Sequence, residues 1–196
     1  FSPLIPDIKH ITFNCDWCLH QITSQTAAVI LETIQGGAGF IEPTNNYLQK
    51  VQQRCNTVGA LFILDEIQPG IGRTGKLFGF ENYNCIPDIV VTGKGLGGGL
   101  PIGAFTASKD MMACLSDNPK LGHITTFGGN PIICAAANAG LIHFNENIDL
   151  NEVEIKGQLI EKTLAHHQEI KAFRRLGLMI GMELHSSENA DSLIIE

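Results

Sequence analysis

Positive charge is scarce in this sequence, and charged residues of any kind make up only 17% of it. Lys and Arg number 13 against 20 Asp and Glu, which gives a net charge of −7. Nucleic acids and anionic membrane surfaces are bound by basic faces, so this balance argues against both kinds of partner. No apolar run approaches the length of a membrane span, and residues 1–4 do not have the pattern of a signal peptide.

Cysteines are few, and all but the first two are scattered. The six lie at positions 15, 18, 55, 85, 114 and 134. A chain of 196 residues that is 44% hydrophobic can bury a core without cross-links, so we expect reduced thiols and a cytoplasmic location. Cys15 and Cys18 form a CxxC motif, but one such pair does not supply the four ligands of structural zinc. We therefore expect no metal site, while a redox role and an unremarkable helical turn both remain open for this pair.

Three short apolar runs, at residues 27–31, 60–64 and 89–91, predict strands that are buried on both faces of a parallel sheet. Helical spacing predicts helices over 46–55, 130–144 and 152–167, and a further strand over 178–184. In the last of these helices, Val153, Leu159, Ile160 and Leu164 are expected to face inward. This order predicts an α/β fold, with a large domain at 1–147 and the beginning of a smaller domain at 148–196.

Polar side chains follow the three predicted strands. Glu32 follows the first run, Asp65 follows the second, and Lys94 lies between two glycines shortly after the third. In an open parallel sheet, ligands bind beyond the carboxyl ends of the strands. A lysine amine there can form a Schiff base with an aldehyde, and an acid facing it can keep a pyridine nitrogen protonated, which are the two needs of pyridoxal phosphate. A simpler interpretation is that the two acidic residues only end their strands and begin turns, and that Lys94 is a solvated loop residue.

The glycine-rich segment at 70–76 (GIGRTGK) has the spacing of a phosphate-binding P-loop. Leu77 stands where such a loop needs Ser or Thr to bind Mg²⁺, and the acidic strand precedes the loop instead of following it. These two features argue against hydrolysis of ATP or GTP. We expect Arg73 and Lys76 to order this turn or a subunit interface.

Six sequence blocks together resemble the class III aminotransferases, which are fold-type-I enzymes that use pyridoxal 5′-phosphate. They are residues 31–36 (LETIQG), 64–70 (LDEIQPG), 72–76 (GRTGK), 87–89 (PDI), 93–104 (GKGLGGGLPIGA) and 125–131 (TTFGGNP). The blocks occur in the family's order and span nearly the whole chain. The resemblance is greatest to the ornithine and acetylornithine aminotransferases. It implies the central part of the family's large domain, with a mostly parallel sheet flanked by helices, followed by the start of a small α+β domain.

The resemblance also implies site residues. Lys94 would be the Schiff-base lysine and the proton shuttle, and Asp65 would pair with the pyridine nitrogen. Gln68 would hydrogen-bond the phenolic oxygen of the cofactor, and Glu32 would lie near the ring and the substrate. Thr126 would reach the cofactor phosphate of the partner subunit in a homodimer.

The sequence departs from the family pattern in three ways. It lacks the upstream phosphate-binding loop, the aromatic residue that stacks on the cofactor and the downstream substrate-binding Arg, so we expect it to be part of a longer chain. Gly37 stands where ornithine-type members carry a Glu, which opens other ω-amino donors. Thr33 replaces the usual Pro.

The implied reaction is a ping-pong transamination. An ω-amino acid or terminal amine gives its amino group through the Lys94 Schiff base to the cofactor, and a 2-oxo acid then takes it. Aminomutase or decarboxylase chemistry and a non-catalytic dimeric relative are the alternatives. Retention of Lys94, Asp65, Gln68 and Thr126 together speaks against the non-catalytic relative.

Overall fold

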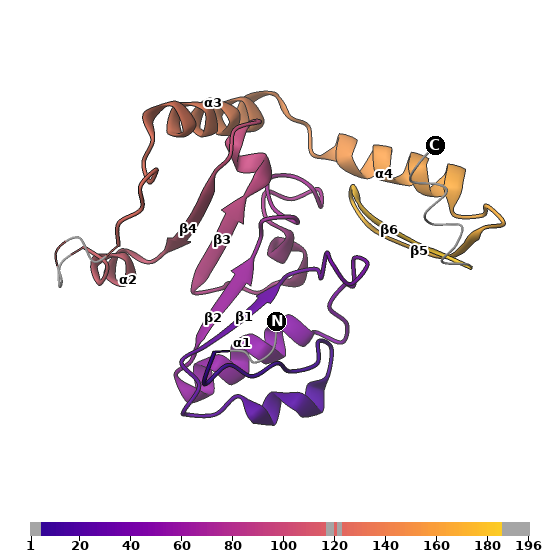
Figure 1. The fold of residues 1–196 in the computed structure, drawn as a ribbon. Coiled ribbons are helices and arrows are strands. Elements are labelled where there is room, and N and C mark those ends of the chain that lie inside the picture. Colours follow the sequence, from indigo (N-terminus) through magenta and orange to yellow (C-terminus); the bar gives the residue numbers. More distant parts are fainter. Residues whose placement is uncertain (1–4, 117–119, 121–122, 186–196) are drawn as a thin grey trace.

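The computed structural model describes residues 5–116, 120 and 123–185. It has the α/β architecture that the sequence predicts, with a four-stranded sheet in the order β1-β2-β3-β4 and a separate two-stranded sheet, β5-β6 (Figure 1). The strands are β1 Ala28–Glu32, β2 Leu61–Asp65, β3 Ile89–Gly93, β4 Gly103–Ala107, β5 Ile170–Leu176 and β6 Met179–Leu184. The α-helices are α1 Tyr47–Val58, α2 Lys109–Ala113, α3 Pro131–Asn147 and α4 Asn151–Leu164. Three 3₁₀ helices complete the fold, at η1 Asp16–Gln21, η2 Gly79–Tyr83 and η3 Lys94–Gly97.

Strands β1, β2 and β3 are parallel neighbours, whereas β4 runs antiparallel to β3. Glu32 pairs with Asp65 across β1 and β2, and Asp65 pairs with Val91 across β2 and β3. The carboxyl ends of the three strands therefore lie at one edge of the sheet, as the sequence predicts. This edge carries the predicted site residues of all three strands.

Helix α1 forms the main core with β2. Its buried side chains are Tyr47, Leu48, Val51 and Cys55, which share one face of the helix because they are three or four residues apart. They pack in one cluster with Phe62 and Leu64 of β2. The helix ends where Gly59 adopts a left-handed backbone with φ of 80°, a conformation that glycine reaches without steric cost. The predicted helix over 46–55 is confirmed and extends one turn further.

Two expectations about burial are wrong. Ile30 of β1 is 66% exposed, because no residue that the structure describes covers that face of the strand. Leu159 of α4 is 65% exposed, although the apolar spacing predicted an inward position. Helix α4 instead turns Gly157 toward the β5–β6 hairpin, where a side chain would collide with the carbonyl oxygen of Gly177 at 2.3 Å. The predicted neighbours Val153, Ile160 and Leu164 are half-buried.

The expectation that all six cysteines are reduced is also wrong. Cys15 and Cys18 form a disulfide, with their Cα atoms 5.3 Å apart, while Cys55, Cys85, Cys114 and Cys134 are free thiols. Residues three apart in a tight turn are close enough to be bridged, and the 3₁₀ helix η1 provides that turn. In the described ranges, no helix has both the length and the apolar character that a membrane crossing requires.

Candidate active site

Lys94 projects from the first position after β3. It begins η3 with a positive φ of 43°, a backbone conformation that non-glycine residues rarely adopt. Its neighbour Gly93 is buried, and a Cβ there would approach the Ile102 carbonyl oxygen to 3.2 Å, whereas Gly95 is exposed. The chain therefore holds a strained, exposed lysine directly after a closely packed glycine. Such strain is common where a side chain must be aimed at a ligand.

Lys94 opens into a cavity of about 290 Å³. Besides Lys94, its polar walls are Gln68, which follows β2, and Arg73, from the glycine-rich turn. Its apolar walls combine Ile67 and Ile71, which follow β2, with residues from two distant parts of the chain: Phe40 from the loop after β1, and Leu178 and Met179 from the β5–β6 hairpin. No carboxylate is among the described residues that line this cavity.

Asp65 ends β2 beside the strand that leads to Lys94. One carboxylate oxygen, Oδ1, accepts the Ile67 amide at 2.9 Å, which fixes the side chain in a local turn. The other oxygen accepts no hydrogen bond from a described residue. Asp65 is half-buried and lies outside the lining of the Lys94 cavity. The structure thus leaves one oxygen of this carboxylate available to a donor such as a protonated ring nitrogen.

Gln68 lies against the loop that follows β1. A Cβ on Gly36 would come within 2.6 Å of Gln68 Oε1, so the Gln68 amide in this position lies directly against residue 36. The Gly36 amide donates to Glu32 Oε2 at 2.8 Å, so the Glu32 side chain folds back on its own turn. Gln35 and Ile41 close this loop with two backbone hydrogen bonds of 3.0 and 3.1 Å. Glu32 and Gln68 therefore meet the same loop, and only Gln68 lines the cavity.

Thr126 is not brought to Lys94. It is exposed in the segment before α3 and is absent from the cavity lining. Helix α3 begins a few residues later, where Asn130 Oδ1 accepts the amides of Ile132 and Ile133 at 3.0 and 3.3 Å. Asn130 therefore caps the helix and Pro131 is its first residue, which confirms the helix predicted over 130–144.

Sequence reasoning missed several residues that surround Lys94. Arg73 was expected only to order the turn or a subunit interface, and no role at the site was predicted for Phe40, Leu178 or Met179. Phe40 adopts a positive φ of 56° beside Gly39, and a loop with three glycines in four residues is the signal that could have marked it. Leu178 and Met179 are more than 80 residues beyond Lys94 in the chain, and no local pattern links them to it.

Across residues 5–116, 120 and 123–185, no three His, Cys, Asp or Glu side chains gather in a way that could hold a metal ion. The polar groups at the strand ends instead fit pyridoxal phosphate. An amine in a cavity suits its aldehyde, an available carboxylate oxygen suits its ring nitrogen, and an amide suits its phenolic oxygen.

Comparisons with known proteins agree with this chemistry. Residues 9–196 match the family model described as aminotransferase class-III. The chain is 39% identical to the acetylornithine aminotransferase of Caldanaerobacter subterraneus, over 100% of this chain and 50% of that protein. It is 41% identical to the putrescine aminotransferase of Pectobacterium atrosepticum, over 96% of this chain and 43% of that protein.

Solved structures give the same answer for the fold. The acetylornithine aminotransferase of Elizabethkingia anophelis superposes with a TM-score of 0.84 at 32% identity, covering 97% of this chain and 50% of that one. The ornithine aminotransferase of Toxoplasma gondii superposes with a TM-score of 0.84 at 30% identity, covering 95% and 46%. The chain spans about half the length of these relatives. It belongs to the class III aminotransferase family and has the fold of the fold-type-I enzymes.

Proposed function

We propose that the protein uses pyridoxal 5′-phosphate to transfer an amino group from an ω-amino acid or terminal amine to a 2-oxo acid, by a ping-pong reaction. The observation that carries the proposal is the common edge of β1, β2 and β3. There Asp65 pairs in register with Glu32, and β3 leads into Lys94 at the cavity. Family membership supports the same reaction class.

The cofactor, when bound, supplies a conjugated ring that accepts negative charge from the substrate carbon. We assign Lys94 Nζ to hold the cofactor's aldehyde carbon, and then to remove and return a proton as general base and acid. Asp65 offers its available oxygen to the ring nitrogen, and a carboxylate there favours the protonated ring. Gln68 donates its amide to the phenolic oxygen, and Glu32, held by the Gly36 amide, shapes the loop beside it.

The cavity wall supports a donor with an aliphatic stem. Phe40, Leu178 and Met179 give it an apolar side, against which the methylene groups of such a donor can pack. The names of the relatives, acetylornithine and putrescine aminotransferase, describe donors with terminal amines. We propose an ω-amino acid or terminal amine as donor, and 2-oxoglutarate or pyruvate as acceptor.

We further propose a homodimer in which Thr126 reaches the cofactor of the partner subunit. Thr126 is exposed and is followed by Phe127, which is 77% exposed, and Ile132 at the start of α3 is 73% exposed. Large apolar side chains that stand in solvent near a polar group are typical of the core of a subunit interface.

A cytoplasmic location and a division between domains at residues 147 and 148 belong to the same proposal. The four free thiols and the separate β5–β6 sheet support them.

The test is borohydride reduction of the full-length protein after addition of pyridoxal phosphate, followed by tryptic mapping. Residues 77–109 follow Lys76 and end at Lys109, and Lys94 is the one Lys or Arg inside this stretch. Reduction of a Schiff base on Lys94 blocks trypsin there, so we expect a single cofactor-bearing peptide that spans 77–109. The variant Lys94→Ala should lose both the adduct and transamination.

Lys109→Ala is the matched control, because Lys109 begins α2 and does not line the cavity. It should keep both the adduct on Lys94 and the activity. A folded full-length protein that forms no adduct on Lys94 would overturn the assignment and favour a non-catalytic relative. A Lys94 adduct without amino transfer to any 2-oxo acid would point to aminomutase or decarboxylase chemistry.

A further inference from the structure

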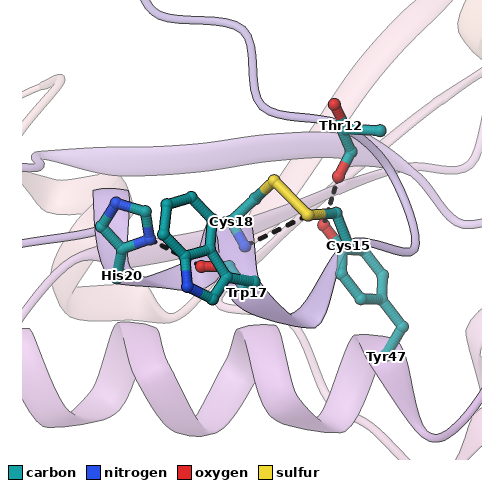
Figure 2. The surroundings of a disulfide bond; sticks show 6 residues. All are labelled: Thr12, Cys15, Trp17, Cys18, His20 and Tyr47. Carbon is teal, nitrogen blue, oxygen red and sulfur yellow. Dashed lines mark hydrogen bonds between the residues drawn. A yellow bond between two sulfur atoms is a disulfide. The ribbon is translucent and has the colours of Figure 1, made fainter.

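The disulfide between Cys15 and Cys18 lies apart from the cavity and has no part in the proposed amino transfer. It closes the turn that opens η1, which lies over α1 (Figure 2). Both cysteines are half-buried, so each residue keeps part of its surface in contact with solvent. Two cysteines separated by two residues are also the spacing at which one thiol can displace a partner from the other.

The two sulfur atoms differ in their surroundings. The Cys18 amide donates to Cys15 Sγ at 3.2 Å, and Cys15 is the residue that caps η1. A hydrogen bond from an amide stabilises a thiolate over a thiol, and the thiolate is the nucleophile in exchange with a disulfide. No described residue donates a comparable hydrogen bond to Cys18 Sγ. Cys15 is therefore the sulfur that attacks, and Cys18 is the one that resolves the mixed disulfide.

The turn keeps its shape without the disulfide. The Cys18 amide donates to the Cys15 carbonyl at 3.0 Å, and the Ile22 amide donates to the Leu19 carbonyl at 3.1 Å. An ion pair between Asp16 and Lys50 ties the turn to α1. Because these contacts do not involve the disulfide, both sulfurs stay within reach of each other after reduction. Opening and closing the bond then requires no refolding.

Trp17 gives the site an exposed aromatic surface. It lies between the two cysteines in the sequence and is 78% exposed, although apolar rings of this size are usually covered. His20 holds it in place, with the two rings 4.2 Å apart and with His20 Nδ1 donating to the Trp17 carbonyl at 2.6 Å. Figure 2 shows both side chains on the same short helical segment as Cys18, which η1 contains. An exposed ring on the residue between the two cysteines offers a contact surface to a small peptide thiol.

We propose that Cys15 and Cys18 form a dithiol–disulfide exchange site that reacts with small thiols and disulfides of the glutathione class. In the oxidising direction, the Cys15 thiolate attacks a sulfur of the small disulfide, forms a mixed disulfide and expels one small thiolate. The Cys18 thiol then loses its proton and its sulfur attacks Cys15 Sγ, which closes the bond and expels the second small thiolate. The two protein protons end on the two released thiols, the protein loses two electrons and the small disulfide gains them.

The test uses the full-length protein in glutathione redox buffers that range from strongly reducing to strongly oxidising. Tryptic peptide 10–50 lies between Lys9 and Lys50, and Cys15 and Cys18 are its two cysteines. After acid quenching and alkylation, we expect this peptide to change from doubly alkylated to unalkylated in one step, with little singly modified species. The exposed thiols Cys114 and Cys134 are internal controls, and we expect them to form at most mixed disulfides.

Two serine variants separate the roles of the sulfurs. Cys18→Ser should accumulate a stable glutathione adduct on Cys15. In Cys15→Ser, the remaining Cys18 should react with the small disulfide about tenfold or more slowly than Cys15 does in Cys18→Ser. Transamination by both variants should match the parent. Peptide 10–50 that stays doubly alkylated, or that stays disulfide-bonded, across the whole series of buffers would overturn the proposal. Equal reactivity of the two variants would overturn the assignment of Cys15 as the attacking sulfur.

Discussion

Thr33 follows β1 directly and is fully buried, as is Glu66. The Thr33 hydroxyl donates to Glu66 Oε1, and this carboxylate also accepts the amides of Gly79 at 2.7 Å and Phe80 at 3.0 Å. Burial raises the pKa of Glu66, while these three donors act in the opposite direction. In the sequence, Thr33 stands out only as a departure from the family's Pro. The structure makes it one of three donors to a buried carboxylate that adjoins Asp65 in the chain.

The isosteric change Thr33→Val should lower the free energy of unfolding by about 1–3 kcal/mol at neutral pH, because a buried carboxylate loses a donor. It should also raise the pKa of Glu66 further. The loss of unfolding free energy is therefore largest at pH values above the pKa of Glu66. It shrinks as the pH falls through that pKa, because the protonated carboxyl group depends less on the donor. Urea unfolding of the full-length protein at a series of pH values measures this dependence.

Thr33→Ser keeps the hydroxyl and is the control for the Val variant. It should retain the wild-type pH dependence, with only the small loss expected from one missing methyl group. If the Val and Ser variants lost the same free energy at every pH, the hydrogen bond to Glu66 would have no energetic role.

Thiol reactivity is a second property decided residue by residue. Burial raises the pKa of both Cys55 and Cys85 to about 11, whereas Cys114 and Cys134 are exposed. When the pH is three units below the pKa of a thiol, about one molecule in a thousand is ionised. The thiolate is the reactive form. In the native protein we therefore expect rapid alkylation at Cys114 and Cys134 and slow alkylation at Cys55 and Cys85. Peptide mapping over time measures the rates, and denaturation should abolish the difference.

Among the secondary-structure elements, α4 and β5 are joined through one arginine. Arg175 of β5 makes a two-pronged contact with Glu154, at 2.8 and 2.9 Å, and its Nε donates to Glu161 at 2.9 Å. Its side chain is only 12% exposed. The Arg175 guanidinium lowers the pKa of Glu154 through these hydrogen bonds. A planar fork that satisfies two carboxylates cannot be replaced by a single ammonium group.

Arg175→Lys should therefore loosen α4 against the β5–β6 hairpin. We expect faster hydrogen exchange in α4 and β5 and a loss of about 1–3 kcal/mol of local stability. Lys156→Ala is the matched control, because Lys156 pairs with Glu152 at 3.4 Å on the exposed face of the same helix. It should cost less than about 0.5 kcal/mol. Equal exchange rates in the two variants would contradict the proposed role of Arg175.

The elements that the sequence predicted are those with a strong local pattern. Strands β1, β2 and β3 are apolar runs, and α1 and α3 have clear periodicity or caps. Strand β4 was missed because its sequence, GAFTA, is built mostly of small residues and is defined by its pairing with β3. Strand β5 was missed because IKAFRRL carries three basic residues, which the structure places in ion pairs or at the surface.

The candidate site divides in the same way. Glu32, Asp65 and Lys94 were predictable because each follows a strand that could be recognised, and parallel strands bring such residues to one edge. Phe40, Leu178 and Met179 reach the cavity from a turn and a distant hairpin. Their positions depend on tertiary contacts that have no counterpart in local spacing.

At the scale of the whole molecule, the β5–β6 hairpin contacts both loops of the site. The Leu178 amide donates to the Arg73 carbonyl at 2.9 Å, and Arg174 Nε donates to the Gly39 carbonyl at 3.0 Å. Gly177, at the tip of the hairpin, has a φ of 59°, and a Cβ there would lie 2.8 Å from the Arg73 carbonyl oxygen. The hairpin can approach the glycine-rich turn this closely only with a glycine at this position.

Gly177→Ala should therefore push the hairpin from the turn and weaken cofactor binding, since Leu178 and Met179 wall the cavity. Gly59→Ala is the matched control: its φ is also positive, at 80°, but a Cβ there meets nothing within 4 Å. The control should lose about 1–2 kcal/mol of unfolding free energy and keep its cofactor affinity. Gly177→Ala should lose more unfolding free energy than the control and should bind the cofactor less tightly. Titration of the full-length apoprotein with the cofactor measures this affinity. Equal cofactor affinities would contradict the contact.

Strands β1 and β2 end opposite each other, with Glu32 paired to Asp65, and this pairing restricts how the protein can change length during evolution. Successive side chains of a strand point to opposite faces, so one inserted residue within β2 would reverse the face of every residue beyond it or displace Asp65 from its place opposite Glu32. An insertion in the turn between α1 and β2 shifts neither the face nor the pairing. Natural variants that differ in length should therefore concentrate their insertions and deletions in the turns, and the strands should keep their residue count.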